Sequence, residues 1–424
     1  MDRSTLTKFS PSRFLTFTIP HPSHSARLLR FSILDSPHHS DVTASPFQIA
    51  ALIVPKGRES DWIFSTASGH LQLLLSSPTP ISRLFLVAEI PLGFPDHPSP
   101  TSFQVVFDPS SELADFLKPL FLYLSPEGTG DVSFVNYDDS VVSSKLVERA
   151  CGEFAGEMLV EDVEIWVECE GNKRSEFRRR LRFKRMPNLV QTEMALVPLD
   201  EDGTRFEVDP MNLAYLPSMV AATSLIRNGA DSVMAVPKAL CLGVGGGALL
   251  AFLKRKLGFE VLGVEMDEEV IRMARKHFGL GEMEAEIVIG DAMEFVRRYR
   301  KRETGKFEVI MVDLDSREGE GGCAPPAEYG KEEFLWEARA IVSDWGIVAV
   351  NAIPVSGWFY EEMVGEFRKV FEELYEIDAE NGESKVIVGR IRSAQIQHSD
   401  APSPFISSLT NALSATLLHS IRRL

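Results

Sequence analysis

The pattern of apolar and polar positions changes near residue 205, where short strands give way to alternating strands and helices. Before that point, apolar runs are separated by clusters of Pro, Ser and Gly, a pattern typical of β-strands joined by turns. Strands are predicted at residues 13–19, 27–34, 49–54, 81–88, 102–107, 157–168 and 177–185. We therefore expect residues 1–205 to form a β-rich N-terminal region.

Residues 206–392 alternate between strand and helix patterns. Strands are predicted at residues 239–243, 260–265, 285–289, 307–313, 346–351 and 384–390. Helices are predicted at residues 211–228, 247–257, 267–278, 291–300, 331–342 and 358–374. Because the strands are continuously apolar, they are typical of a parallel sheet that is buried on both faces. This pattern predicts a doubly wound α/β sheet.

The last segment, residues 393–424, begins polar and then regains a helical pattern. Apolar residues recur there at near-helical spacing, at Leu409, Leu413, Leu417 and Ile421. A helix with one apolar stripe packs that stripe against a neighbouring surface. We expect a docked amphipathic helix, with Arg422 and Arg423 near its negative C-terminal end.

Charge and hydropathy exclude two broad classes of partner. The 424-residue chain has a formal net charge of −17, whereas charge-driven nucleic-acid binding requires a basic surface. No apolar run approaches the roughly 20 residues that a membrane-spanning helix needs. The sequence therefore predicts neither a nucleic-acid partner nor a membrane partner.

The cysteines give no sign of a metal site or of a disulfide framework. The sequence contains four of them, Cys151, Cys169, Cys241 and Cys323, and none stands in a Cys-x-x-Cys pair. Reduced thiols in the cytoplasm are the simplest interpretation, and no metal ion is expected.

The N-terminal segment raises an alternative compartment. Its first 34 residues contain many Ser and several basic residues but one acid, Asp2, a composition that resembles a plastid transit peptide. The same segment contains the predicted strands at 13–19 and 27–34, which favour a place in the mature fold. The cytoplasm is therefore the expected location, with a plastid as the alternative.

The main chemical signal is a glycine-rich turn between a predicted strand and a predicted helix, in the run from Leu240 to Ala248. Gly243, Gly245 and Gly247 let the backbone turn sharply and approach a ligand with no Cβ in the way. Taken alone the turn is weak evidence, because dinucleotide-dependent enzymes use it too.

Acidic residues after the next two strands make the signal more specific. Glu265 ends the second strand, where a carboxylate can accept hydrogen bonds from both hydroxyls of a ribose. Asp291 follows the third strand beside Ala292, where it can read the adenine edge. A helix N-cap is the alternative role for Asp291. The combination favours S-adenosylmethionine over a nicotinamide cofactor.

The fourth strand ends in two further acids, Asp313 and Asp315. Ligands of open α/β sheets bind at the carboxyl ends of the strands, so both carboxylates are expected in the site. An acid there can hold an incoming amine and accept its proton, and a purely structural role is the alternative. Asn351, at the end of the fifth strand, either lines the same pocket or makes a structural hydrogen bond.

These residues resemble a known family. The glycine turn, Glu265, Asp291 and the strand-four acids are similar to those of the spermidine synthase-like class I methyltransferases. More closely, the chain resembles the C-terminal half of the methyltransferase-like protein 13 family from about residue 49 to 392. The segments that carry this resemblance are 51–62, 156–163, 177–179, 188–193, 309–316 and 323–326.

The resemblance implies a fold, a reaction and roles for individual residues. It implies a seven-stranded sheet that binds S-adenosylmethionine, and methylation of the N-terminal α-amine of translation elongation factor 1-alpha rather than of a lysine, which is the alternative acceptor. By position, Asp315 would contact the substrate amine, Asp313 would lie beside the cofactor, and Gln191 would contact the cofactor. The resemblance also implies a homodimer as one assembly, and the oligomeric state stays open.

Two alternative functions remain at this stage. A polyamine aminopropyltransferase needs carboxylates at both ends of its diamine, because a buried unpaired ammonium is costly. The family's two further acids are replaced here by Gly246 and Ser316. A non-catalytic binding protein with a methyltransferase fold is the second alternative, and the intact acids Glu265, Asp291, Asp313 and Asp315 argue against it.

Overall fold

The computed structural model divides the chain into two compact units. It describes residues 6–37, 48–75, 81–105, 111–126, 129–169, 172–198, 206–213, 216–227, 236–281, 285–302, 306–316, 324–353, 357–378, 384–391 and 405–424. Unit 1 comprises Met1–Arg149, Glu161–Arg178 and Arg182–Val190, and unit 2 comprises Ala150–Val160, Arg179–Leu181 and Gln191–Leu424. This division differs from the single boundary expected near residue 205, because the strands between residues 141 and 183 contribute to both units.

Unit 1 contains a five-stranded sheet in the order β1-β2-β4-β3-β6. Its strands are β1 (Phe14–Pro20), β2 (Arg27–Asp35), β3 (Ile49–Ile53), β4 (Arg83–Pro91) and β6 (Ser133–Phe134). They are accompanied by the helices α2 (Trp62–Ser65), α3 (Ala67–Leu75) and α4 (Ser111–Tyr123). The N-terminal segment with the transit-peptide-like composition therefore supplies β1 and β2 of this sheet.

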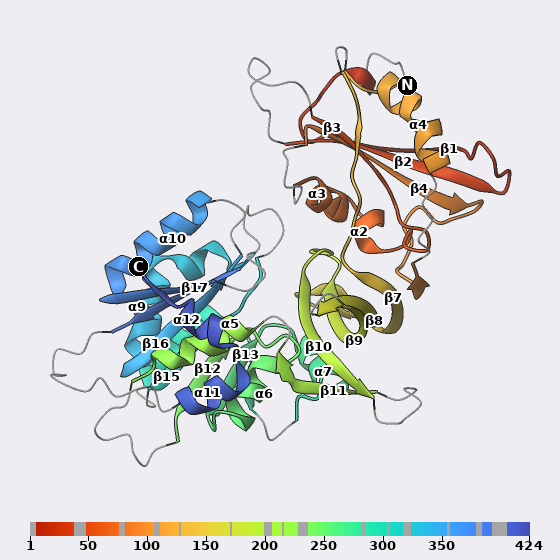
Figure 1. Cartoon of the computed structure of the whole chain (residues 1–424). Coiled ribbons are helices and arrows are strands. Elements are labelled where there is room, and N and C mark those ends of the chain that lie inside the picture. The colour runs from red at the N-terminus through yellow and green to blue at the C-terminus, as the bar shows by residue number, and fades with distance from the viewer. Residues whose placement is uncertain are drawn as a thin grey trace. The chain divides into compact units, whose positions relative to one another are not determined.

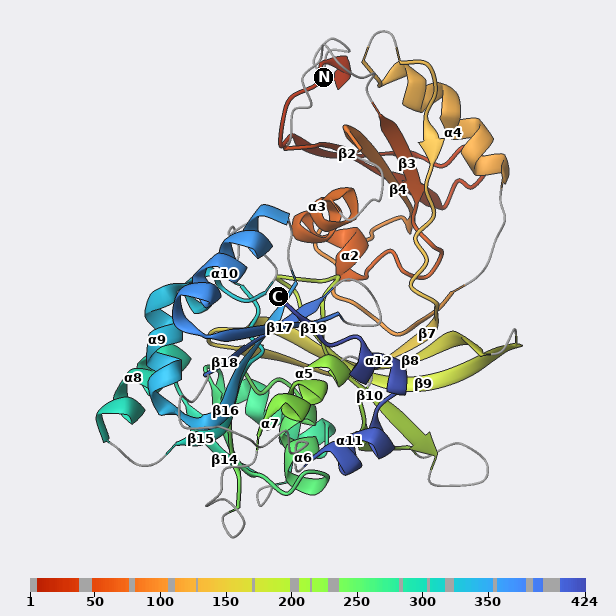
Figure 2. The same cartoon turned by 60° about the vertical axis from the view of Figure 1, so that its left-hand side comes forward.

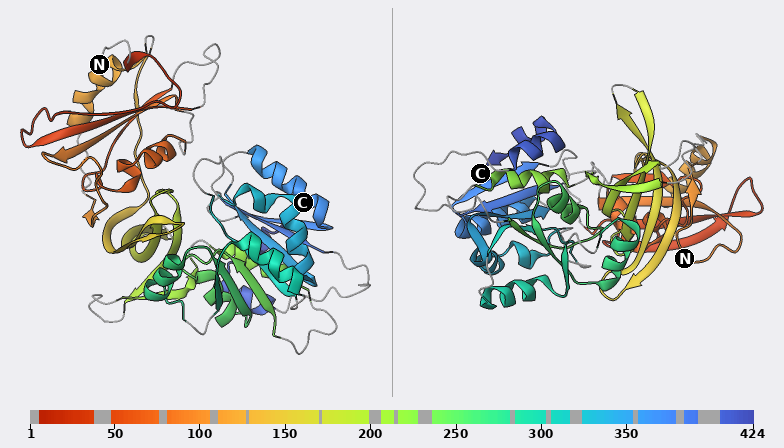
Figure 3. Two further views of the ribbon diagram at one scale, coloured as in Figure 1. Left: turned by 180° about the vertical axis from the view of Figure 1, so that it is seen from behind. Right: turned by 90° about the horizontal axis from the view of Figure 1, so that it is seen from below.

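Both faces of this sheet are buried. Alternate residues of each strand point to opposite sides, so each strand contributes to a core on either face. Leu29, Phe31 and Phe85 belong to a core that includes α4, whereas Leu84 and Leu86 belong to a second core that includes α2 and α3. Figures 1 and 3 show α4 on one face of the sheet and the short helices on the other.

Unit 1 also contains a buried network of ion pairs. Arg58 lies 2.8 Å from Asp61, and Arg182 lies 3.1 Å from the other oxygen of Asp61. Burial by itself raises the pKa of Asp61, but the charges of Arg182 and Arg58 lower it to about 2. The run from Ala51 to Trp62, which supports the family resemblance, thus contributes two charged residues to the interior of unit 1.

A six-stranded sheet follows the order β11-β10-β9-β8-β7-β5. Its strands are β5 (Phe103–Gln104), β7 (Val141–Gly152), β8 (Gly156–Cys169), β9 (Asn172–Phe183), β10 (Val190–Pro198) and β11 (Phe206–Leu213). The helix predicted over 211–228 is wrong in its first part, since residues 211–213 belong to β11 and, among the described residues of this range, only α5 (Pro217–Ala221) and a 3₁₀ turn at Ala222–Leu225 are helical. Pro210 disfavours a helix before this point, and Pro217 suits a helix start.

The predicted α/β sheet is confirmed, with eight strands in the order β14-β13-β12-β15-β16-β18-β17-β19. The strands are β12 (Lys238–Leu242), β13 (Glu260–Glu265), β14 (Glu286–Ile289), β15 (Phe307–Val312), β16 (Val342–Ala352), β17 (Glu373–Asp378), β18 (Lys385–Arg390) and β19 (Arg422–Arg423). Strands β12 to β16 pair in parallel, whereas β18 runs antiparallel to both of its neighbours. This order, with one reversed strand, is that of the seven-stranded methyltransferase sheet, extended here by β19.

Helices cover both faces of the sheet. They are α6 (Ala248–Arg255), α7 (Glu268–His277), α8 (Ala292–Arg302), α9 (Glu332–Ile341) and α10 (Gly357–Val370). Figure 2 shows α8, α9 and α10 on one side of the strands and α5, α6 and α7 on the other. None of the helices in the described ranges is long and apolar enough to cross a membrane.

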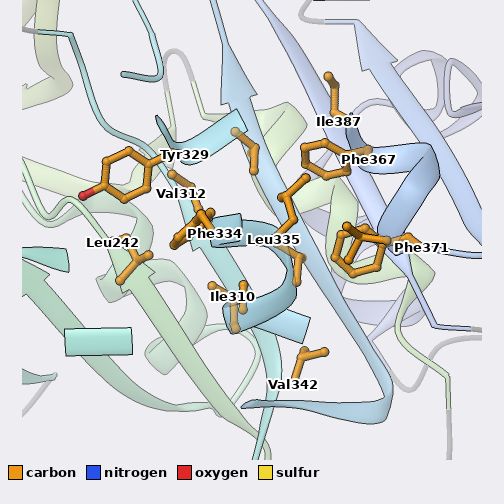
Figure 4. Close-up of a cluster of buried hydrophobic side chains, with 14 of the residues drawn as sticks. Leu242, Ile310, Val312, Tyr329, Phe334, Leu335, Val342, Phe367, Phe371 and Ile387 are labelled. Atoms are coloured by element: carbon orange, nitrogen blue, oxygen red, sulfur yellow. The ribbon is translucent and has the colours of Figure 1, made fainter. Parts of the chain in front are cut away.

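One hydrophobic core of the α/β sheet lies between the strands and the helices α8 to α10. It contains Leu242, Ile310 and Val312 from the strands and Phe334 and Phe367 from α9 and α10. Figure 4 shows these side chains packed together beside the sheet. Because Leu242 and Val312 are the last residues of β12 and β15, this core fixes the strand ends from which the site residues follow.

The C-terminal tail differs from the single amphipathic helix that was expected. It forms α11 (Ile406–Ala412), α12 (Ala415–His419) and then β19, which pairs with β17. Ser414 separates the two helices, because its hydroxyl caps α12 by accepting a hydrogen bond from Leu417 N. Arg422 forms an ion pair with Glu376 of β17 instead of neutralising a helix end.

Candidate active site

The glycine turn lies between β12 and α6, as the sequence predicts. Gly243, Gly245 and Gly247 have φ angles of +89°, +51° and +83°, which residues with a side chain rarely adopt. A Cβ on Gly243 would lie 2.1 Å from the carbonyl oxygen of Asp313. The turn therefore requires glycine at this position for a close approach to the end of β15 as well as for its backbone angles.

The Glu265 carboxylate connects the glycine turn to the loop that follows β13. Its Oε2 accepts a hydrogen bond from Val244 N at 3.1 Å, and its Oε1 accepts from Met266 N at 2.9 Å and Asp267 N at 3.2 Å. Burial raises the pKa of Glu265, and these backbone donors oppose that rise. An acid at the end of β13 is thus held against the turn, in the position where the sequence predicts a ribose contact.

Asp313 follows the carboxyl end of β15, and Asn351 is the last residue but one of the neighbouring strand β16. Asn351 Nδ2 donates a hydrogen bond to Asp313 Oδ1 at 2.9 Å, and Asp313 N donates to Leu242 O at 2.9 Å. Burial raises the pKa of Asp313, the Asn351 hydrogen bond lowers it, and the charge of Asp315 raises it further. Of the two roles considered for Asn351, the structure shows a hydrogen bond, and the bond is made to a predicted site residue.

Asp315 lies two residues beyond Asp313 and is partly buried. Its charge acts on Asp313, so the two predicted acids occupy one region at the edge of the sheet. The next residue, Ser316, is buried. Two carboxyl groups in one region can together hold an amine and accept its proton.

Asp291 acts as a helix cap in the structure. Its Oδ1 accepts a hydrogen bond from Glu294 N at 2.8 Å at the start of α8, and its side chain is exposed, whereas Ala292 is buried. An open cavity of about 690 Å³ borders Asp291 and runs along β13, β14 and α8. Neither Glu265 nor Asp313 lines this cavity. The candidate site is therefore located by the hydrogen bonds at the strand ends and not by this cavity.

Gln191 lies beside the glycine turn, on β10. A Cβ on Gly245 would lie 3.6 Å from the Gln191 carbonyl oxygen and 3.0 Å from Thr192 Oγ1. Thr192 is buried, and its hydroxyl oxygen accepts a hydrogen bond from Gly246 N at 2.7 Å. The sequence predicts a role for Gln191 but not for Thr192, because a polar residue within a β-strand gives no sign of the distant turn that it contacts.

Asp267 is a second residue of the site region that the sequence does not predict. Its Oδ1 caps α7 by accepting from Glu269 N at 3.0 Å, and its Oδ2 accepts from Phe154 N and Ala155 N, both at 2.8 Å. The latter two residues form the turn between β7 and β8, which belongs to unit 2. A cap pattern before α7 was readable in the sequence, but the contact with residues more than a hundred positions earlier was not.

Comparison with known proteins relates the chain to two kinds of enzyme. Residues 225–377 match the spermine/spermidine synthase domain family. The chain is 26% identical over 389 residues to an "eEF1A lysine and N-terminal methyltransferase" from Xenopus laevis, an alignment that covers 83% of this chain and 52% of the relative. The chain thus spans about half the length of the curated relatives that it matches.

Two further similarities complete this comparison. A polyamine aminopropyltransferase from Pyrococcus abyssi is 30% identical over 188 residues, covering 41% of this chain and 62% of that protein. The crystal structure of human methyltransferase-like protein 13 in complex with SAH aligns with a TM-score of 0.41 and 22% identity, covering 47% of this chain and 90% of that chain.

Proposed function

We propose that this chain is an S-adenosylmethionine-dependent protein N-methyltransferase that acts on the N-terminal α-amine of translation elongation factor 1-alpha. The observation that carries the proposal is the alignment with the eEF1A lysine and N-terminal methyltransferase over 83% of the chain. The alignment length takes in most of the region before residue 225 as well as the synthase-like domain. A nucleotide-binding fold alone would not suggest a protein substrate.

The residues at the edge of the sheet fit the proposed cofactor. Gly243, Gly245 and Gly247 would accommodate the amino-acid tail, and the Glu265 carboxylate would accept hydrogen bonds from the ribose hydroxyls. Asp291 and Ala292 would lie along the adenine, with Gln191 contacting the cofactor from β10. When bound, S-adenosylmethionine supplies an electrophilic methyl group on a sulfonium sulfur.

The acids after β15 provide what the amine substrate needs. Asp315 would accept a hydrogen bond from the neutral amine and direct its lone pair at the methyl carbon. Attack of the nitrogen on that methyl carbon would leave the C–S electron pair on sulfur and a positive charge on nitrogen. Asp315 would then accept the released proton, while Asp313, held by Asn351, would maintain negative charge beside the site.

Three alternatives follow from the same site. A lysine side chain of the same substrate presents the same kind of amine, and the relative's name includes both acceptors. Aminopropyl transfer is favoured by the similarity to the Pyrococcus abyssi protein. Against it, Gly246 and Ser316 leave the site without the two further carboxylates that a buried diamine requires. The third alternative is a non-catalytic binding protein.

A methyl-transfer assay distinguishes these functions. The purified chain would be incubated with methyl-labelled S-adenosylmethionine and elongation factor 1-alpha whose N-terminus is either free or chemically blocked. We expect label on the free form alone, whereas label on both forms would move the acceptor to a side chain. A parallel reaction with putrescine and decarboxylated S-adenosylmethionine tests aminopropyl transfer. Cofactor binding without transfer in any reaction would favour the non-catalytic alternative.

A compartment and an oligomeric state complete the proposal. We propose that the protein acts in the cytoplasm, with a plastid as the alternative compartment, and that it assembles as a homodimer. Fluorescence microscopy of a C-terminally tagged full chain tests the compartment. Light scattering on the purified protein tests the assembly, and a monomeric mass would reject the dimer.

A further inference from the structure

We propose that Thr192 is a positioning residue that holds the glycine turn in the conformation that binds the cofactor. This inference rests on the proposed function and extends it to a residue on β10. Thr192 is 1% exposed, and its Oγ1 accepts a hydrogen bond from Gly246 N at 2.7 Å. The same hydroxyl donates its proton to Gln191 O at 2.8 Å.

The two hydrogen bonds fix the direction of the hydroxyl group. A threonine hydroxyl has one proton to donate and lone pairs with which to accept. Because the proton is directed to Gln191 O, a lone pair is left to face Gly246 N. The donor and the acceptor therefore cannot exchange roles without losing one of the two bonds, and a buried amide without a partner is costly.

The turn needs such an anchor because it is rich in glycine. Glycine loses more conformational freedom on ordering than any other residue. The α/β sheet itself holds part of the turn, through Gly243 N to Val264 O at 2.9 Å and Val244 N to Glu265 Oε2 at 3.1 Å. Thr192 holds the following part, at Gly246, from a different strand. Cofactor binding then requires less ordering of the turn, which favours affinity.

The Thr192 methyl group makes a second contribution by shape. A Cβ on Gly246 would lie 2.4 Å from Thr192 Cγ2 and 3.0 Å from Thr192 Cβ. The methyl group thus occupies the space that a side chain at position 246 would need. Residues 192 and 246 therefore form a matched pair, in which the threonine requires glycine opposite and supports it by a hydrogen bond.

Three substitutions separate these contributions. Thr192→Val keeps the shape and removes the hydroxyl, so we expect the dissociation constant for S-adenosylhomocysteine to rise about tenfold by calorimetry. Thr192→Ser keeps the hydroxyl and should bind within about threefold of the wild type. Gly246→Ala should bind poorly in the wild-type background and recover in part when it is combined with Thr192→Ser, because the closest clash, with the methyl group, is then absent.

Thr223→Val provides a matched control. Thr223 is also fully buried in unit 2, and its hydroxyl donates to Val220 O at 2.7 Å. This variant should lower the melting temperature without changing cofactor affinity. If Thr192→Val remains folded and binds with wild-type affinity, or if Thr192→Ser binds as weakly as Thr192→Val, the proposal is wrong.

A measurement without ligand keeps this inference separate from the proposed function. Hydrogen–deuterium exchange of a peptide covering residues 243–250 should be faster in Thr192→Val than in wild type, and close to wild type in Thr192→Ser. Equal protection in all three proteins would overturn the anchoring role. Failure of the wild-type chain to bind S-adenosylmethionine or its product would instead reject the proposed cofactor, and exchange would still decide whether Thr192 anchors the turn.

Discussion

The Asn351 side-chain amide holds the Asp313 carboxylate from the neighbouring strand, with 2.9 Å between Nδ2 and Oδ1. Both residues lie at the carboxyl ends of their strands, Asp313 just after β15 and Asn351 within the last two residues of β16, and Asn351 is 9% exposed. The hydrogen bond lowers a pKa that burial raises. Asn351 therefore influences the pKa of Asp313, beside the proposed cofactor site, without itself having to contact a ligand.

We expect Asn351→Leu to move the acidic limb of the rate profile to higher pH. The substitution removes the donor that stabilises the charged form of Asp313, so the pKa of this acid rises further. A hydrogen bond to a charged group is worth about 1.5–3 kcal/mol, which corresponds to a shift of about one to two pH units. Measuring kcat/KM for methyl transfer between about pH 5 and 9 tests this. A limb that stays in place would show that Asp313 is not the titrating group.

Asp315→Ala is expected to abolish turnover while leaving cofactor affinity within about threefold of wild type. General-base and positioning roles of this kind contribute about 10²–10⁴-fold to the rate. Single-turnover methyl transfer and calorimetry on the same preparation provide the two measurements. Asp344→Ala, which alters an exposed acid near the start of β16, serves as the control. A wild-type rate for Asp315→Ala would remove this residue from the site.

Glu265→Gln should mainly weaken cofactor binding, by about tenfold to a hundredfold. The amide keeps the shape but loses the charge and places an NH₂ group against backbone N–H groups that now donate to the carboxylate. Calorimetry with S-adenosylhomocysteine measures the effect. Glu260→Gln changes an exposed acid at the other end of β13 and should bind like wild type. Unchanged affinity in Glu265→Gln would reject the assignment of this residue to the ribose.

Asp267→Ala should destabilise the protein more than Asp291→Ala does, although both residues cap helices. Loss of a cap costs about 1 kcal/mol, and Asp267 also accepts two hydrogen bonds from the Phe154 and Ala155 amides. We expect a loss of about 3 kcal/mol for Asp267→Ala and about 1 kcal/mol for Asp291→Ala. Urea denaturation followed by tryptophan fluorescence measures the difference. Equal losses would mean that the turn between β7 and β8 gains nothing from Asp267.

His70 should make the stability of unit 1 depend on pH. The ring is buried and Nε2 donates to Phe64 O at 2.7 Å, and burial lowers its pKa from 6.5 to about 4. The unfolded chain therefore binds more protons between these values, so stability present above about pH 6.5 is lost as the pH falls towards 4. The full effect is about 3 kcal/mol.

Urea midpoints measured from pH 7 to pH 4 test the role of His70. His70→Gln retains a donor for Phe64 O but does not titrate, so its midpoint should change less with pH. His97→Gln alters an exposed histidine of unit 1 and should keep the wild-type dependence. The same slope in His70→Gln and wild type would show that other groups cause the loss.

The sequence predicts the parallel part of the α/β sheet well because its signals are local. Strands β12 to β15 are apolar along their length and are bounded by turns, so their predicted ends lie within one residue of the observed ends. Strand β17 was missed, because α10 ends at Val370 and β17 begins at Glu373. No Gly or Pro marks this boundary, and the predicted helix ran through it.

Contacts between distant segments account for most of what the sequence did not predict in the site. Glycines and strand-end acids can be located from their neighbours along the chain, which is why Gly243, Glu265 and Asp313 could be predicted. Thr192 and Asp267 act on partners that are 54 and 112–113 residues away. Nothing in their local sequence specifies those partners.

The chain passes from one compact unit to the other at residues 149–150, 160–161, 178–179, 181–182 and 190–191. No single cut therefore separates the two units from each other. A truncated protein that starts at residue 206 would lack both Thr192 and the turn that Asp267 binds. Recombination of gene segments would therefore have to keep Thr192 and the turn at Phe154 and Ala155 together with the α/β sheet whose loops they contact.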